Sequence, residues 1–136
     1  MLPDDTFKKE IQRTFSGATW ESKVGYCRAI RMGKIIAVTG TISLDAAGEI
    51  HAPDDPYQQA KRCLEIIERA IKPLGAERRQ IIRTRMFVTD ISQWQEFGRA
   101  HGEFFADYPP ATSMLEIKAL IDSKALIEIE ADAVVL

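Results

Sequence analysis

The side chains that could do chemistry in this sequence of 136 residues gather on three segments with the alternation of β-strands. PPATSMLEI, residues 109–117, carries the neutral hydroxyl of Thr112 among small and apolar residues. Charged residues recur at every second position in two other segments, at Arg83 and Arg85 and at Glu128, Glu130 and Asp132. Residues two apart share one face of a strand, so the sequence predicts a cationic and an acidic strand face. Such groups either hold a ligand and a water or pair with one another.

The two helices predicted below can cover only one side of a sheet of this size, which leaves the charged side without a cover. To that side we assign Glu116, Glu128, Glu130, Arg83 and Arg85, together with Phe87 and Met114. Thr112 belongs to the same side, because it alternates in step with Met114 and Glu116. One interpretation is a solvated face with cross-strand ion pairs of modest strength. The other is a polar interface between subunits, which the apolar side chains among the charges favour.

The cysteines and histidines lack the spacing of metal ligands. Cys27 and Cys63 form no CxxC pair, and His51 and His101 lie far apart, so we expect reduced thiols and no metal site. His101 shares the apolar stripe of a predicted helix, where a packed, hydrogen-bonded imidazole is the commoner role.

The elements that must position these groups follow from periodicity and from turn residues. Two β-rich runs flank Gly33 and predict a hairpin within residues 26–40. Asp55 and Pro56 predict the start of a helix that ends by Gly75 and buries Ala60, Cys63, Leu64, Ile67, Ala70, Ile71 and Leu74. A strand follows in residues 78–90. Ser92 and Gln95 match a capping box, and the helix after them should bury Trp94, Phe97, Phe104 and Phe105. Two strands near 111–120 and 125–135 complete the pattern.

Composition restricts the class of protein. With 46% hydrophobic residues and a formal charge of -2, residues 1–136 fit a single domain with its own core. Basic residues are interspersed with acids, which argues against a nucleic-acid partner. The charged start, MLPDDTFKKEIQRTF, lacks the apolar core of a secretory signal, and no segment reaches the length of a membrane span, so we expect a cytoplasmic protein without a membrane partner.

Several of these segments occur together in one known family. The sequence resembles the YjgF/RidA family in GYCRAIRMGKIIAVTGTI, RTRMFVTDISQWQEF, HGEFF and PPATSMLEIKALIDSKALIEIEADAVV, in register along nearly the whole chain. The resemblance implies an α+β single domain, with a mixed, mainly antiparallel sheet and two helices on one face. It further implies a chorismate-mutase-like homotrimer with clefts between subunits for small imino or keto acids, and no cofactor.

The resemblance also implies roles for individual residues. Tyr26 matches the pocket tyrosine, Thr39 and Gly40 match a small hydroxyl residue and its glycine, and Glu128 matches the acid that orders the attacking water. Thr112 stands where the deaminases carry an arginine that binds the substrate carboxylate. A threonine supplies neither the charge nor the forked geometry of a guanidinium, so standard α-imino acids should be poor substrates.

Each of these assignments has a structural alternative. Tyr26 can pack at a subunit contact, Thr39 can be an ordinary strand residue, and Glu128 can be an ion-pair partner. Arg85 either offers the missing cation to the cleft or pairs with Glu116, Glu128 or Glu130. Two functions therefore stay open: a cofactor-independent imine or enamine deaminase, and a non-catalytic trimeric module that binds a metabolite or a protein.

Overall fold

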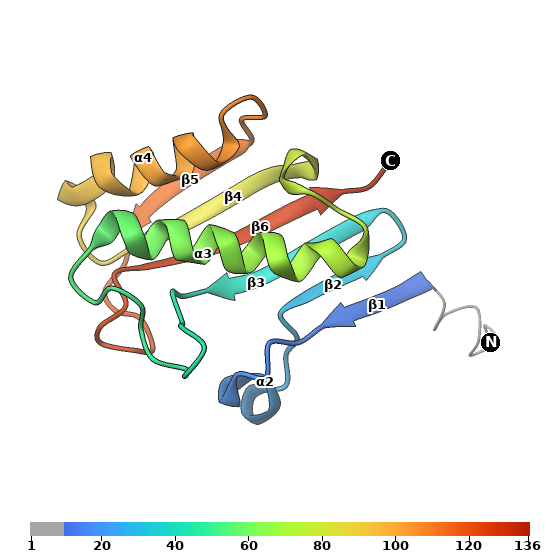
Figure 1. Ribbon diagram of the computed structural model, residues 1–136, viewed down its shortest axis with the longest axis horizontal. Helices are drawn as coiled ribbons and strands as arrows, with labels where there is room; N and C mark the ends of the chain where they lie inside the picture. Colours follow the sequence, from blue (N-terminus) through green and yellow to red (C-terminus); the bar gives the residue numbers. More distant parts are fainter. Residues whose placement is uncertain (1–9) are drawn as a thin grey trace.

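The computed structural model describes residues 10–136 and contains one six-stranded sheet with the strand order β1-β2-β3-β6-β4-β5. The charged start, for which the sequence predicts no secretory signal, lies mostly outside the described residues, because residues 1–9 are not included. The elements are β1 (Ile11–Thr14), α2 (Thr19–Val24), β2 (Ala29–Met32), β3 (Ile35–Thr41), α3 (Pro56–Ile71), β4 (Ile81–Val88), α4 (Trp94–Phe105), β5 (Ala111–Glu116) and β6 (Ile127–Val134). Helices α3 and α4 lie next to each other on one face of the sheet (Figure 1).

The predicted hairpin is confirmed as β2 and β3, which pair in antiparallel fashion around Gly33. Gly33 has φ of 61°, a left-handed conformation that glycine adopts without a steric penalty. The hairpin is extended by β1, which pairs with β2 and was not expected from the sequence. The short helix α2, between β1 and β2, was not expected either.

The helix that the sequence predicted after Asp55 is confirmed as α3. The Asp55 carboxylate accepts a hydrogen bond from the backbone N–H of Gln58, and Pro56 occupies the first helical position. All seven predicted core positions are buried under the helix. Regular α-helix stops at Ile71, and a single 3-10 turn through Pro73 leads to Gly75.

The core lies between the two helices and the inner face of the sheet. Thr84, Met86 and Val88 of β4 are buried there, as are Ile127 and Ile129 of β6. The residues between them point to the other face, where the side chain of Arg85 meets Glu130 and Asp132. The predicted faces of β6, and of β4 from Arg83 to Val88, are therefore confirmed, whereas Ile82, at the register shift before Arg83, is 54% exposed and not on the inner face as the alternation predicts.

The predicted face of β5 is wrong. Strand β5 pairs only with β4, in parallel, and β4 separates it from β6. The register places Thr112 beside the inward-facing Thr84, and the two hydroxyls hydrogen-bond at 2.6 Å. Met114 packs against the core from the same side. Thr112 and Met114 thus lie on the helix-covered face, because a strand takes its inner and outer faces from the neighbour to which it is bonded.

Glu116, the last residue of β5, likewise does not join the charged face. It alternates with Thr112 and Met114 along the strand, and its carboxylate accepts a hydrogen bond from the backbone N–H of Ile91. Glu116 therefore binds the turn before α4 and is not a partner of the arginines of β4.

The predicted capping box at Ser92 is also wrong. Asp90 caps a 3-10 turn, Ile91–Gln93, by accepting hydrogen bonds from the N–H and the hydroxyl of Ser92. The α-helix begins only at Trp94, whose side chain is 55% exposed, whereas Phe97 and Phe105 are buried. Because Ser92 donates both its N–H and its hydroxyl to Asp90, its side chain does not cap the helix. The helix therefore starts later than the motif predicts.

Within residues 10–136, no helix combines the length and the apolar character needed to cross a bilayer.

Asp55→Ala should lower the free energy of unfolding by about 0.5–2 kcal/mol, because it removes the cap of the longest helix. Denaturant unfolding measures the change. Asp54→Ala is the matched control, since the neighbouring Asp54 caps nothing among the described residues and should change stability by less than about 0.5 kcal/mol. Equal effects of the two substitutions would contradict this role for Asp55.

Candidate functional site

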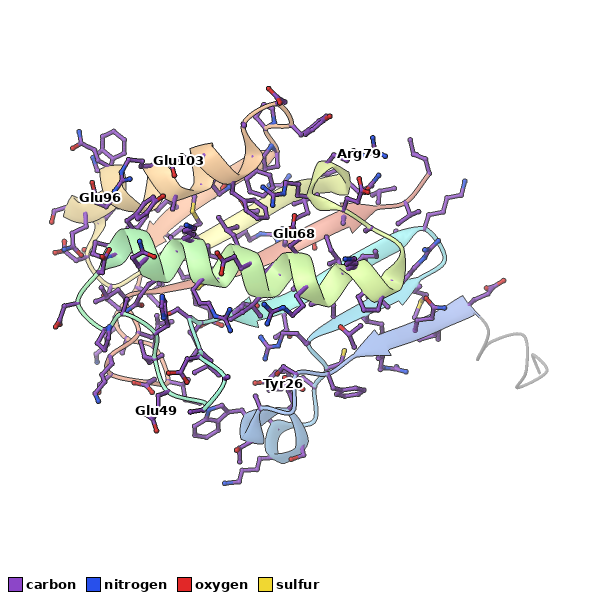
Figure 2. The ribbon with its side chains drawn as sticks, in the orientation of Figure 1. Tyr26, Glu49, Glu68, Arg79, Glu96 and Glu103 are labelled. Carbon is purple, nitrogen blue, oxygen red and sulfur yellow. The ribbon has the colours of Figure 1, made fainter. Side chains whose placement is uncertain are left out.

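A hollow of about 970 Å³ lies between α2, the ends of β3 and β6, and one side of α3. Tyr26, Thr39, Gly40 and Glu128 all line it, so the fold brings together four of the residues singled out in the sequence. Figure 2 shows Tyr26 beside α2, in the segment that leads into β2. The hollow is large enough for a small metabolite.

Gly40 and Glu128 are in direct contact. A Cβ atom on Gly40 would lie 1.8 Å from Oε1 of Glu128, closer than any two such atoms approach. Because glycine has no Cβ atom, Gly40 makes room for the carboxylate of Glu128. The strand register shifts between Val38 and Thr41, so this contact sits at an irregularity of β3 opposite β6.

The position of Glu128 alters its titration. Burial, followed by the negative charge of Glu130, raises the pKa of Glu128, and the positive charge of Arg28 opposes this rise. A carboxyl with a raised pKa is a better proton acceptor near neutral pH than an ordinary surface carboxylate. The arrangement can therefore bind a water or a polar ligand and exchange a proton with it.

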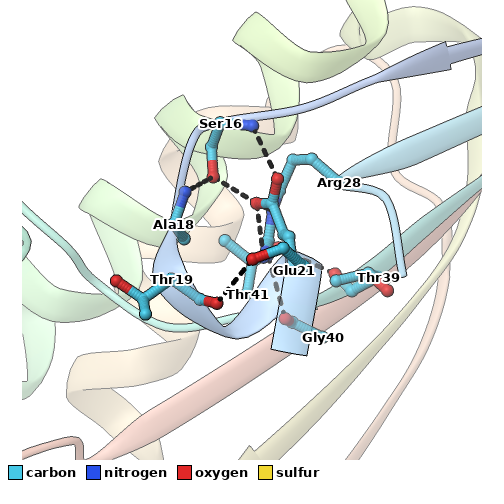
Figure 3. Close-up of polar contacts among 9 residues, drawn as sticks. Ser16, Ala18, Thr19, Glu21, Arg28, Thr39, Gly40 and Thr41 are labelled. Carbon is cyan, nitrogen blue, oxygen red and sulfur yellow. Dashed lines mark hydrogen bonds and ion pairs between the residues drawn. The ribbon is translucent and has the colours of Figure 1, made fainter. Parts of the chain in front are cut away.

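A buried ion pair between Glu21 of α2 and Arg28 supports this site (Figure 3). Nε and Nη2 of Arg28 each lie 3.3 Å from Oε2 of Glu21, and Nη1 donates to the carbonyl of Gly40 and to Oγ1 of Thr41. The Glu21 carboxylate also accepts hydrogen bonds from the backbone N–H and the hydroxyl of Ser16. Arg28 thereby fixes the irregular end of β3, where Gly40 meets Glu128.

Sequence reasoning missed this pair. Glu21 lies in α2 and Arg28 directly before β2, and neither falls on a periodic apolar pattern. The only signal was Arg28 itself, two residues after the pocket tyrosine and directly before the buried Ala29. An arginine at the entrance to a buried strand requires an acidic or carbonyl partner, but the sequence does not reveal which one.

Thr112 and Arg85 are not part of the hollow within one chain. Thr112 lies on edge strand β5, with β4 between it and β6. Arg85 projects from the opposite face of the sheet, where Nη1 lies 3.2 Å from both Glu130 and Asp132. The predicted pairing of Arg85 with Glu130 is thus confirmed, and the structure adds Asp132 as a second partner.

The hydroxyl of Thr112 is the exposed end of a buried hydrogen-bonded chain. Thr84 is fully buried and links Thr112 to Nε2 of His101, at 2.6 and 2.8 Å respectively. Burial lowers the pKa of His101 to about 4, so its imidazole is neutral at physiological pH. The packed, hydrogen-bonded His101 that the sequence favoured is confirmed.

The chain is similar to known proteins over nearly all of its length. The model of the family described as Endoribonuclease L-PSP matches residues 17–135. The chain belongs to this family. A crystal structure from Mycobacterium tuberculosis, described as a member of the YjgF/YER057c/UK114 family, is 42% identical over 92% of this chain and 99% of that one, with a TM-score of 0.84. The resemblance to YjgF/RidA and the predicted fold class are both confirmed.

Two further relatives cover most of the chain. An uncharacterized protein of Streptomyces coelicolor is 32% identical over 123 residues, which are 90% of this chain and 91% of that protein. The yjgF gene product of Escherichia coli is 28% identical with a TM-score of 0.76 and covers 90% of this chain and 98% of its own. In each comparison the similarity therefore covers nearly the full length of this chain and of its relative.

Among the described residues, no group of three or more His, Cys, Asp or Glu side chains is arranged to hold a metal ion.

Gly40→Ala should displace the Glu128 carboxylate, because the new methyl group would take its place. We expect the pKa of Glu128 to fall toward the ordinary value as its burial is lost. A carboxyl 13C titration by NMR, assigned with Glu128→Gln, measures this pKa.

Gly102→Ala in α4 is the control for Gly40→Ala, since a Cβ there meets nothing within 4 Å. It should leave the pKa of Glu128 unchanged. If the two alanine variants titrate alike, Gly40 does not hold a place for the carboxylate.

The His101 imidazole should make stability depend on pH. Its folded pKa, about 4, lies below the unfolded value of about 6.5, so the unfolded chain binds more protons in between and stability falls as the pH decreases from 6.5 to 4. The loss is at most about 3.5 kcal/mol, at about 1.4 kcal/mol for each pKa unit.

Unfolding of wild type and His101→Gln across this pH range isolates the imidazole contribution from that of the carboxylates. The glutamine variant should show a shallower decline, whereas His51→Gln, at an exposed position, should decline like wild type. Parallel curves for wild type and His101→Gln would refute the assignment.

Proposed function

We propose that the protein is a homotrimer that hydrolyses an imine or enamine metabolite to a carbonyl compound and ammonia without a cofactor. The observation that carries the proposal is the half-buried Glu128 carboxylate, held over Gly40 in a hollow that Tyr26 and Thr39 also line. Family membership supports a role in processing or binding small molecules.

The reaction needs one positioned carboxylate and one water. Glu128 accepts a proton from the water while the water oxygen forms a bond to the imine carbon. Glu128 then passes this proton to the imine nitrogen. The resulting carbinolamine loses ammonia and leaves a carbonyl group, while an enamine reaches the same route after it tautomerises to the imine. Because the pKa of Glu128 is raised, the carboxylate can both accept the proton and return it.

The trimer is proposed because one chain leaves the predicted cleft incomplete. Thr112 lies on an edge strand whose side chains are mostly exposed, away from the hollow that Glu128 lines. A neighbouring copy that packs along this edge would bring its Thr112 to the hollow, as in the clefts between subunits that the family resemblance implies. The exposed side chains of Ile35, Ile82 and Leu115 supply apolar surface for such contacts.

A non-catalytic binding module of the same fold is the second candidate. The observation that favours it is Thr112, since no guanidinium is available there to hold a substrate carboxylate. An RNA substrate, which the description of the family model suggests, is not proposed because the chain has a formal charge of -2.

Two further features are proposed with this function. We infer one domain over residues 1–136, because a single core connects the sheet with both long helices. We also infer a cytoplasmic location, because Cys27 and Cys63 are free thiols.

Glu128→Gln should reduce imine hydrolysis by at least about a hundredfold while the trimer persists, because the amide keeps the shape of the side chain but accepts no proton. Imines are formed in situ by an amino-acid or amine oxidase, and ammonia release is followed against a semicarbazide trap. Light scattering reports the mass in the same preparations.

Asp132→Asn is the matched control, since Asp132 lies on the same strand, pairs with Arg85 and is not among the groups that shift the pKa of Glu128. It should retain most of the activity. Unchanged hydrolysis in Glu128→Gln would remove this carboxylate from the reaction, and a wild type that accelerates none of the imines would favour the binding module. A monomeric mass for the wild type would rule out the composite cleft.

A further inference from the structure

The hollow that contains Glu128 continues as a groove between α2 and α3, and the two sides of this groove differ in character. The side formed by α2 and the segment before it carries Phe15, Trp20 and Val24. These side chains are 66%, 41% and 67% exposed, which is unusual for large apolar residues gathered in one place. This side offers apolar contact area that the fold itself does not use.

The opposite side of the groove is a basic face of α3. Arg62, Ile66 and Arg69 line it, and their spacing of four and three residues places them on one side of the helix. Nε of Arg62 donates to the carbonyl of Leu44, and its Nη1 lies 3.8 Å from Glu65. Within residues 10–136, the exposed guanidinium of Arg69 makes neither an ion pair nor a hydrogen bond.

The acids of the hollow do not neutralise Arg69. Asp45 accepts hydrogen bonds from the backbone N–H groups of Ala47 and Glu49 within its own turn. Arg28, a further cation of the lining, is already bound to Glu21. The groove therefore has a proton-accepting carboxyl, Glu128, in one part, an unpaired guanidinium in another, and an apolar side beside them.

We propose that this groove binds a ligand with an apolar, ring-sized body and a single carboxylate, with the carboxylate at Arg69 and the body against Trp20 and Phe15. The inference rests on the proposed function and narrows its substrate class, because the imine carbon must still reach Glu128. The carboxylate of the ligand is then bound at α3 and not at Thr112. In such a ligand the carboxylate is separated from the reacting carbon by more atoms than in an α-imino acid. A guanidinium recognises a carboxylate through two parallel hydrogen bonds, and the indole ring gives contact area at low entropic cost.

Phenylbutyrate and its neutral amide, phenylbutanamide, test this assignment because they share the apolar body and differ in the carboxylate. The chain has two tryptophans, so a Trp94→Phe background leaves Trp20 as the only indole reporter. Phenylbutyrate should change the fluorescence of Trp20 and bind at least about tenfold more tightly than the amide. Arg69→Gln should reduce the affinity for phenylbutyrate to that for the amide and leave the amide unaffected.

Arg79→Gln is the control for charge alone, since Arg79 is exposed in the turn before β4 and does not line this hollow (Figure 2). It should leave the binding of both compounds unchanged. Equal affinities for acid and amide, equal losses in the two arginine variants, or no response of Trp20 would each overturn the inference. The measurement involves no turnover, so an inactive wild type or an active Glu128→Gln would contradict the proposed function without affecting this result.

Discussion

The buried pair of Glu21 and Arg28 is the interaction on which the candidate site depends. Two charges removed from water must have nearly all their hydrogen-bonding capacity satisfied, or the fold loses several kcal/mol. Here that requirement connects the segment before α2, the helix itself and the irregular end of β3. The hydrogen bond from Arg28 to the carbonyl of Gly40 helps to fix Gly40, and the contact of Gly40 with Glu128 in turn helps to fix the carboxylate.

The same requirement divides the charged residues into two classes. Arg28 and Arg85 are each bound to acids of their own chain, so they shape the protein and offer little to a ligand. Glu128 and Arg69, by contrast, form no ion pair within residues 10–136 and line the same hollow. The unpaired charges are therefore better candidates for binding a ligand than the charges that already have a partner in the fold.

The sequence predicted the elements whose pattern is local. The stripe under α3 and the turn at Gly33 depend on neighbours in the chain, and both were found where expected. The inner face of β5 depends on its register with β4, which alternation alone does not reveal, so Thr112 was placed on the wrong side. The sequence could indicate Tyr26, Thr39, Gly40 and Glu128 only through the family resemblance. Arg69 could be identified only after the fold had placed it in the lining of the same hollow.

The place of β6 in the sheet has a consequence for biosynthesis. Although β6 follows the other strands of the described sheet in chain order, it lies between β3 and β4 and bonds to both. Until it emerges from the ribosome, the nascent chain can form only two separate pieces, β1-β2-β3 and β4-β5, each with an open edge and an uncovered apolar face. Such edges invite pairing with other chains. The growing polypeptide is therefore most prone to aggregate while β6 is still inside the ribosome, and the insertion of β6 closes the open edges of β3 and β4 together.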